Sequence, residues 1–541
     1  MTRGESAALA STARLKFWTS ASAGWRRAGL AVAAGSLSVL AFAPVFAFPI
    51  LFCTLPVLVW LIDSSPTPRA AAWSGWCFGF GYFFFNLFWI GEAFLVEADK
   101  FAWLLPFAIT LLPAGLGMFW ALAAWISRRV WPQGFARVLV LAITLSSVEW
   151  LRGHLFTGLP WNVIGYALTY PLALMQSASL MGVYALTLLA VAIFTGPLVI
   201  LADPDAGERN QRIIRSALWG ALPVALMFVY GTWRLSEPQT FVDGVKIRIV
   251  QPNVLQTEKW KPEHQLRIFQ DHLALTVSEP SGVRDDMAGI THVIWPEAAM
   301  PFFPLEQLQA LEAIGATLPD GRVLITGGLR RELTNADGSP LPYTARKAFN
   351  SLMVFNDVGQ LTASYDKIHL VPFGEYLPME SLLGELGLNF LTQGLGTFST
   401  GVEPRPLITV SGLPPVLGLI CYEVLFPGQI VQSADRPGVI INVTNDGWFG
   451  NSTGPRQHFH QTRVRAVEEG VPVLRAANNG ISGAIDPYGR VLFSLGMNKR
   501  GVIDTPLPKA GTATPFSRFG NGVFLAFLAL FALAARQMSK K

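Results

Sequence analysis

The chain has 541 residues, of which 51% are hydrophobic and only 14% are charged. A typical soluble domain has about 25% charged residues, so this composition excludes an ordinary soluble protein. The formal net charge of +5 is modest and forms no dense basic stripe, which argues against a nucleic-acid partner. Three cysteines, Cys53, Cys77 and Cys421, are too few for a disulfide framework, and no Cys/His cluster indicates a metal site.

Long apolar runs occupy most of the chain before residue 235 and return once near the C-terminus. About 20 apolar residues cross the hydrocarbon core of a bilayer, and lipid restricts such segments to helices. We therefore expect a membrane domain with about seven helices over 1–234 and a last helix with a tail over 517–541. The predicted spans lie near residues 27–45, 47–63, 70–91, 102–126, 136–152, 172–202, 213–233 and 517–535.

Cationic residues alternate with these spans. They precede the first span, follow the last one and fill every second loop, as Arg128, Arg129 and Arg137 do. By the positive-inside rule, both termini face the cytoplasm and residues 235–516 face the opposite side. The sequence therefore predicts a multi-pass protein of the bacterial inner membrane with a periplasmic soluble domain.

From residue 245 onward, short β-branched runs separated by turns replace the long apolar runs. Strands are predicted at 245–251, 291–297, 323–328, 415–424 and 438–446, and hairpins at 351–365 and 482–494. Helical patterns lie between them at 261–278, 305–317 and 456–469. This alternation predicts a layered α/β domain over 235–516, with catalytic groups at strand ends and in the following loops.

Three side chains suited to acyl-transfer chemistry follow predicted strands or hairpins: Glu297, Lys367 and Cys421. Taken singly, each has an ordinary interpretation, because lone cysteines usually pack in a core and lone charges usually lie at the surface. Together they supply a thiol nucleophile, a carboxylate base and a cation for the thiolate and the oxyanion. His458 and His460 project to different sides of a helix, so we expect packing or surface residues and not metal ligands.

The segments around these residues resemble the nitrilase superfamily. WPE (295–297), YDKIHLVPFGEYLP (365–378) and GLICYEVLFP (418–427) are similar to its three catalytic segments, and NVTNDGWFG (442–450) continues the similarity. In the membrane part, LRGHLFTGLPWNVIGYAL (151–168) resembles the marker segment of apolipoprotein N-acyltransferases. The resemblance covers nearly all of the chain and implies an αββα sandwich for the soluble domain, beside the bundle of about eight membrane helices.

The resemblance also implies roles for the matching residues. Glu297 is expected to be the general base, Lys367 the cation that stabilises the oxyanion, and Cys421 the nucleophile. Four further residues are expected to support the site or to bind substrate: Glu375 beside the triad, Tyr422 with its backbone N–H as a second oxyanion donor, Glu423 next to it, and Trp260 on a mobile loop near the substrate entrance. An alternative for Trp260 is an aromatic side chain resting at the membrane interface.

The implied reaction moves an acyl chain from a membrane phospholipid, with phosphatidylethanolamine as the expected donor, onto Cys421 as a thioester. The α-amine of the diacylglyceryl-cysteine of an apolipoprotein then accepts the chain, and no cofactor is implied. The apolar stretch 382–396 is too short to span a bilayer. It is expected either to dip into the headgroup region or to pack as a helix of the soluble domain.

Two other functions remain open at this point. A membrane-anchored amidase or nitrile hydrolase would use the same triad, but one anchor would suffice for it, and segment 151–168 would have no purpose. A non-enzymatic transporter or scaffold would be expected to carry ionisable residues at mid-membrane. Here charges lie near span ends, apart from Glu149 and Arg152 near one boundary, and the three catalytic residues are intact.

Overall fold

The computed structural model of the chain describes residues 3–279, 281–282, 287–333, 339, 341–342, 346–385, 397–432 and 435–539. These residues divide into two compact units. Unit 1 comprises Met1–Glu237, Ser452–His460 and Ala513–Lys541, and unit 2 comprises Pro238–Asn451 and Gln461–Thr512.

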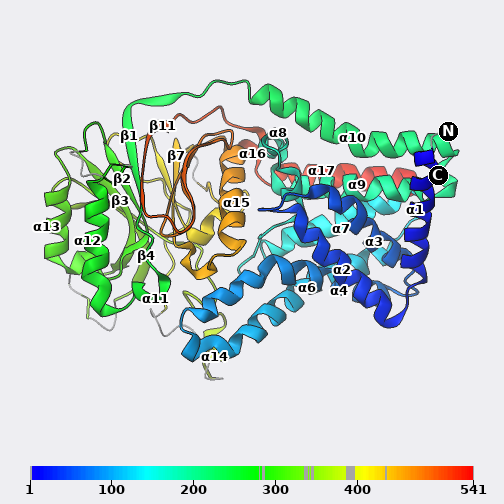
Figure 1. Cartoon of the computed structure of the whole chain (residues 1–541), viewed down its shortest axis with the longest axis horizontal. Helices are drawn as coiled ribbons and strands as arrows, with labels where there is room; N and C mark the ends of the chain where they lie inside the picture. The colour runs from blue at the N-terminus through cyan, green and yellow to red at the C-terminus, as the bar shows by residue number, and fades with distance from the viewer. Residues whose placement is uncertain are drawn as a thin grey trace. The chain divides into compact units, whose positions relative to one another are not determined.

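Unit 1 is helical (Figure 1). Its helices are α1 (Arg3–Ala21), α2 (Gly24–Ser38), α3 (Leu51–Asp63), α4 (Pro68–Leu87), α5 (Ala98–Phe101), α6 (Leu105–Arg129), α7 (Ala136–Arg152), α8 (Leu172–Met175), α9 (Ala178–Leu201), α10 (Arg209–Arg234), α16 (Pro515–Phe519) and α17 (Gly522–Ser539). Hydropathy did not predict α1, which contains Arg14 and Lys16.

Five helical stretches in the described part of the chain are long and apolar enough to cross a membrane. They are Pro68–Leu95, Ala98–Arg129, Ala178–Leu201, Arg209–Arg234 and Gly522–Ser539. The other three predicted spans contain α2, α3 and α7, which are shorter helices of 15, 13 and 17 residues. The structure therefore supports a membrane bundle, while the number of about eight spans stays a prediction.

Glycines on α4 and its neighbours let three helices approach closely. A Cβ on Gly35 of α2 would collide with the Phe78 carbonyl of α4, and a Cβ on Gly75 of α4 would lie 2.6 Å from the Trp120 carbonyl of α6. Small residues at such contacts bring backbones together, which is how membrane helices gain packing energy without a hydrophobic driving force between them.

A buried ion pair at the end of α7 explains why this helix carries charge. The Arg152 guanidinium lies 2.6 Å from the Glu149 carboxylate, and neither side chain is exposed. Trp120 donates to Glu149 at 2.8 Å, and Arg152 donates to the carbonyls of Leu159 and Trp161. Because the ion pair is saturated by hydrogen bonds, its charges are compensated within the helical unit. The same contacts fix the start of segment 151–168.

The helix α15 (Gly454–Glu469) belongs to unit 1 as far as His460 and to unit 2 from Gln461 onward. Within unit 1, Trp161 donates from Nε1 to Gln457 at 2.7 Å, and Thr169 Oγ1 lies 2.7 Å from His460 Nε2. His458 and His460 are both buried. They are packing residues, and the surface alternative for them is wrong.

Unit 2 contains two mixed β-sheets. Its strands are β1 (Phe241–Gln251), β2 (His292–Met300), β3 (Val323–Arg331), β4 (Ala348–Phe355), β5 (Leu361–Asp366), β6 (Val416–Ile420), β7 (Val439–Thr444), β8 (Val473–Ala477), β9 (Ser482–Ile485), β10 (Val491–Leu495) and β11 (Gly501–Pro508). Its helices, besides part of α15, are α11 (Gln256–Lys259), α12 (Gln265–Thr276), α13 (Leu308–Thr317) and α14 (Glu380–Glu385). Both predicted hairpins and four of the five predicted strands are confirmed. The fifth, predicted at 415–424, ends at Ile420, because the chain turns at Cys421 into a short 3₁₀ helix.

The first sheet has the order β11-β1-β2-β3-β4-β5, and the second has the order β10-β9-β8-β7-β6. Strands β1, β2 and β3 run parallel to one another, as do β6, β7 and β8, while the outer neighbours are antiparallel. Parallel strands have their carboxyl ends at one edge of a sheet, so residues that follow β2 or β6 are brought to defined edges.

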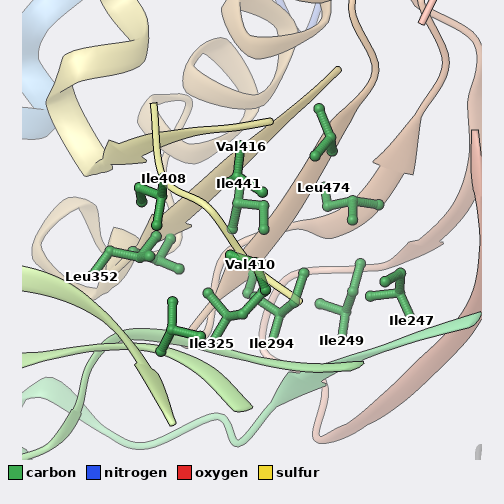
Figure 2. Close-up of a cluster of buried hydrophobic side chains, with 14 of the residues drawn as sticks. Ile247, Ile249, Ile294, Ile325, Leu352, Ile408, Val410, Val416, Ile441 and Leu474 are labelled. Atoms are coloured by element: carbon green, nitrogen blue, oxygen red, sulfur yellow. The ribbon is translucent and has the colours of Figure 1, made fainter. Parts of the chain in front are cut away.

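A hydrophobic core lies between the two sheets (Figure 2). Ile249 and Ile294 of the first sheet face Ile441 and Leu474 of the second within this core. The opposite face of the first sheet packs against α12 and α13, and α15 reaches the second sheet, where Thr462 accepts a hydrogen bond from Arg475 of β8. The layers are helix, sheet, sheet and helix, which is the αββα arrangement expected from the sequence.

The centre of this core gives a prediction about stability. Ile441 is fully buried, so Ile441→Ala should lower the free energy of unfolding by about 2–5 kcal/mol, since it leaves a cavity in both sheets' shared core. The matched control Ile441→Val should cost about 0.5–1.5 kcal/mol. Denaturant unfolding of the detergent-purified protein measures both, and equal losses for the two variants would contradict the packing.

Candidate active site

Cys421 lies where β6 ends and the chain turns sharply. Its φ of 48° is in the left-handed region, and the 3₁₀ helix η11 (Cys421–Leu425) begins at this residue. A non-glycine residue keeps such a conformation only when its surroundings impose it, and strain of this kind clusters at functional sites. The side chain is nearly buried, with 8% exposed. The turn thus presents the thiol at the carboxyl end of a parallel strand.

Glu297 and Lys367 come to the same place from the first sheet. Glu297 lies within β2, and Lys367 follows β5 directly. The Lys367 ammonium is 3.8 Å from the Glu297 carboxylate, and both charges act electrostatically on Cys421. The structure therefore brings the three residues together, as the expected triad requires.

Two neutral donors hold the Glu297 carboxylate. Asn350 Nδ2 donates to Oε1 at 2.8 Å, and the backbone N–H of Asn445 donates to Oε2 at 2.8 Å. The same Asn350 amide donates to Glu375 at 2.9 Å, so it bridges the two carboxylates. Glu375 forms the closer ion pair with Lys367, at 2.8 Å. Glu375 therefore lies beside the triad, where the sequence placed it.

Burial and charge set the resting protonation of this site. Burial raises the pKa of Cys421, the Glu297 carboxylate raises it further, and Lys367 only partly opposes them. Burial alone would lower the pKa of Lys367, but Glu375 and Glu297 raise it above its ordinary value. The resting site accordingly holds a neutral thiol and a firmly protonated ammonium. A base must remove the thiol proton before the sulfur can attack.

Glu423 ties the nucleophile turn to the lysine segment. Its carboxylate accepts five hydrogen bonds, from Tyr365 Oη, Arg405, and the backbone N–H groups of Ile420, Ile368 and His369. Two of these donors directly follow Lys367, and one directly precedes Cys421. Glu423 thus fits a supporting role and not an oxyanion role, because a carboxylate saturated by donors offers none itself.

Tyr422 and Trp260 were both expected near the substrate. The Tyr422 ring packs against Phe426 at 5.0 Å, and its backbone N–H stays a predicted oxyanion donor. Trp260 caps α11 and packs partly buried on a small cluster that contains Leu370 and Phe398. Its indole N–H has no acceptor in the described part of the chain. Neither the entrance position nor the membrane-interface alternative is settled by these contacts, so both stay predictions.

Sequence reasoning missed Lys259, Asn350 and Asn445, all of which contact Glu297. Lys259 is buried and donates from Nζ to the Glu297 carbonyl at 3.0 Å. Asn350 lies within β4, and no sequence signal separated it from an ordinary asparagine. Asn445 directly follows β7 and falls in segment 442–450, whose resemblance to the superfamily was its one signal. Lys259 had one signal, since it directly precedes Trp260. The stretch 382–396 lies outside the described residues, apart from the backbone of 382–385 and the exposed Glu385.

Two family models match this chain. Residues 34–195 match the apolipoprotein N-acyltransferase N-terminal domain, and residues 246–514 match the carbon-nitrogen hydrolase domain. The apolipoprotein N-acyltransferase of Rhodopseudomonas palustris is 44% identical over 529 residues, which cover 95% of this chain and 96% of the relative. The apolipoprotein N-acyltransferase of Bradyrhizobium diazoefficiens is 45% identical over 532 residues, which cover 96% of each chain.

Among solved structures, an amidase from Nesterenkonia sp. is similar over 50% of this chain and 92% of its own, with 20% identity and a TM-score of 0.34. A score this low adds nothing to the family match. The fold and the site define a carbon-nitrogen hydrolase domain, joined in one chain to an apolar helical unit. The chain belongs to the apolipoprotein N-acyltransferase family, and it is an acyltransferase. The N-terminal match supports this over the amidase and over a non-enzymatic scaffold.

Gly327 of β3 gives a prediction about the position of Glu297, the expected base. A Cβ at this position would lie 2.5 Å from the Glu297 Cα, so Gly327→Ala must displace the Glu297 backbone. A displacement of about 1 Å in a catalytic group costs on the order of 10²-fold in rate. Gly328→Ala is the matched control, because its Cβ meets only the flexible ends of Met353 and Met300, at 2.5 and 3.8 Å. N-acylation assays should show the large loss for Gly327→Ala alone.

Glu423 gives a prediction about stability. Glu423→Gln leaves Arg405 without its buried carboxylate, which should lower the free energy of unfolding by about 3–5 kcal/mol. Asp271→Asn removes an exposed partner of Arg500 and should cost at most about 1 kcal/mol. Thermal unfolding of both variants measures the difference, and a Glu423→Gln protein as stable as the control would refute the role of this carboxylate.

Proposed function

We propose that the chain transfers an acyl chain from a membrane phospholipid, through a thioester on Cys421, to the N-terminal diacylglyceryl-cysteine of apolipoproteins. The observation that carries the proposal is the convergence of Glu297, Lys367 and Cys421 in a member of this family. The acyl donor is phosphatidylethanolamine, and the acceptor is the α-amine of the diacylated cysteine.

In the first half-reaction, Glu297 takes the proton of the Cys421 thiol, and the thiolate attacks the ester carbonyl of the phospholipid. The developing oxyanion is stabilised by the Lys367 ammonium and by the backbone N–H of Tyr422. When the C–O bond breaks, Glu297 returns the proton to the departing lysophospholipid alcohol. Asn350 and Asn445 keep the carboxylate oriented while its protonation changes.

In the second half-reaction, the neutral α-amine of the acceptor attacks the thioester. Glu297 takes a proton from the attacking nitrogen, and the C–S bond breaks to release the Cys421 thiolate. The thiolate then recovers the proton from Glu297, so the site ends in its resting state. Glu297 thus acts alternately as general base and general acid in both half-reactions of the ping-pong mechanism.

The membrane helices suit this reaction because both substrates are lipids. Drawing an acyl chain out of the bilayer costs about 0.8 kcal/mol per CH₂ group, so a site at the membrane surface avoids most of that cost. The distribution of arginine and lysine supports an inner-membrane location with residues 235–516 on the periplasmic side, between a membrane domain at 1–234 and a last helix and tail at 517–541.

Intact mass spectrometry after incubation with phosphatidylethanolamine tests the thioester. The wild-type protein should gain one acyl mass, mapped to Cys421, and lose it when a diacylglyceryl-cysteine peptide is added. Cys421→Ala should gain none, since it has no sulfur to acylate. Cys53→Ser, at an exposed cysteine of α3, should behave as the wild type. An acyl mass on Cys421→Ala equal to that of the wild type would refute the assignment.

A further inference from the structure

A second lysine is buried beside the triad and has no assigned role. Lys259 ends the short helix α11 and is 2% exposed. Its Nζ donates to the Glu297 carbonyl at 3.0 Å, which is its one hydrogen-bond acceptor among the described residues. Lysine is almost never fully buried without a partner, because removing an ammonium from water costs several kcal/mol. The centre of the Trp260 ring also lies 5.8 Å from this Nζ. One carbonyl and an aromatic ring at that distance do not compensate a cost of several kcal/mol, so nearby negative charge must contribute.

The charges around Lys259 show what compensates it. Lys367 forms its close ion pair with Glu375 at 2.8 Å and lies 3.8 Å from Glu297. The Glu297 carboxylate therefore has two neutral hydrogen-bond donors and only a long ion pair with Lys367. Lys259 interacts electrostatically with Glu297 and with Cys421. With it, two ammonium groups face two carboxylates, and the buried site is electrically balanced.

This balance survives the proton transfer that the reaction needs. When Glu297 takes the proton of Cys421, a negative charge moves from the carboxylate to the sulfur, and the total charge is unchanged. Both ends of that transfer lie within the field of Lys259. Without the second cation, one of the two would be an uncompensated anion in a water-poor site, which is costly in either protonation state.

We propose that Lys259 is a positioning residue for the proton exchange between Glu297 and Cys421. It fixes the main chain of Glu297 through the carbonyl, and it supplies the positive charge that balances whichever partner is ionised. The inference rests on the proposed roles of Glu297 and Cys421, and it extends them to a residue that acts through these two groups.

Among the residues that the structure describes, three titratable groups interact with Lys259 from the elements around it: Glu297 on β2, Cys421 on η11 and His272 on α12. Burial lowers the pKa of His272 to about 4, so this ring is neutral near neutral pH. Burial also lowers the pKa of Lys259 to about 8, although Glu297 and Cys421 pull in the opposite direction. Lys259 is thus charged below about pH 8 and loses its charge above it.

The test is the pH profile of the first half-reaction in the full-length, detergent-purified enzyme. Release of lysophospholipid from phosphatidylethanolamine is followed in a single turnover without acceptor, so that the α-amine of the acceptor does not contribute to the profile. The headgroup amine of the donor titrates identically for every variant, so differences between variants report on the protein. The wild-type rate should fall as pH rises through about 8, when Lys259 becomes neutral. Lys259→Arg keeps its charge to higher pH, so its alkaline fall should move upward.

Two further variants separate charge from hydrogen bonding. Lys259→Gln retains a donor for the Glu297 carbonyl without a charge, and Lys259→Met removes both. Each should acylate roughly tenfold more slowly at neutral pH. Without the cation the buried pair of carboxylate and thiol takes up a proton more readily, and each unit by which the pKa of the pair rises reduces its anionic, reactive form about tenfold. Neither should show the alkaline fall. Lys261→Gln, at an exposed lysine two residues away, is the control and should keep the wild-type profile.

The inference is overturned if Lys259→Gln acylates at the wild-type rate with the same alkaline fall. Should Lys259→Gln and Lys259→Met fail to fold, judged by thermal unfolding, the Lys259→Arg profile decides, and an unmoved alkaline fall overturns the inference. A wild-type enzyme that releases no lysophospholipid and gains no acyl mass would instead refute the proposed phospholipid step. The two failures are therefore distinguishable.

Discussion

The buried Lys367 ammonium and the carboxylates around it are the interaction on which the catalytic unit depends. Removing this cation from water is costly, and Glu375 and Glu297 offset the cost only if both are held within a few ångströms. The fold meets that condition by bringing the end of β5, the strand β2 and the loop with Glu375 together. Asn350 then joins both carboxylates, so that neither can turn away from the lysine.

The position of Cys421, the expected nucleophile, is linked to that of Lys367 by the Glu423 carboxylate. This carboxylate binds the end of β6 and the segment after β5 at once, so the strained turn at Cys421 and the position of Lys367 are fixed together. A neutral thiol at rest suits an enzyme that must meet a lipid ester before it reacts, because an idle buried thiolate would be costly and open to side reactions. In the proposed reaction, Glu297 removes the thiol proton when substrate is present.

In the helical unit, the helices associate through close backbone contact, and a buried ion pair is compensated by hydrogen bonds. Helices in lipid cannot rely on the hydrophobic effect to associate, and here glycines such as Gly35 and Gly75 provide close backbone contact. Polar groups that do enter this unit are saturated, as the Glu149–Arg152 pair is by Trp120 and by carbonyls of the marker segment. Segment 151–168 is thereby a tightly bonded part of the unit and not a loose connection.

The sequence by itself determined the apolar helical part, the α/β character of the soluble part, the two hairpins and the residues that proved to converge, Glu297, Lys367 and Cys421. It could do so because hydrophobic period and motif spacing are local properties. Only the tertiary structure decided three roles. Glu423 accepts hydrogen bonds from both the turn at Cys421 and the segment after Lys367, Asn350 bridges two carboxylates, and Lys259 is a second buried cation. Those roles depend on distances between segments far apart in the chain. Even Lys259, whose neighbour Trp260 drew attention to the segment, carries no local sign of its burial or of its contact with Glu297.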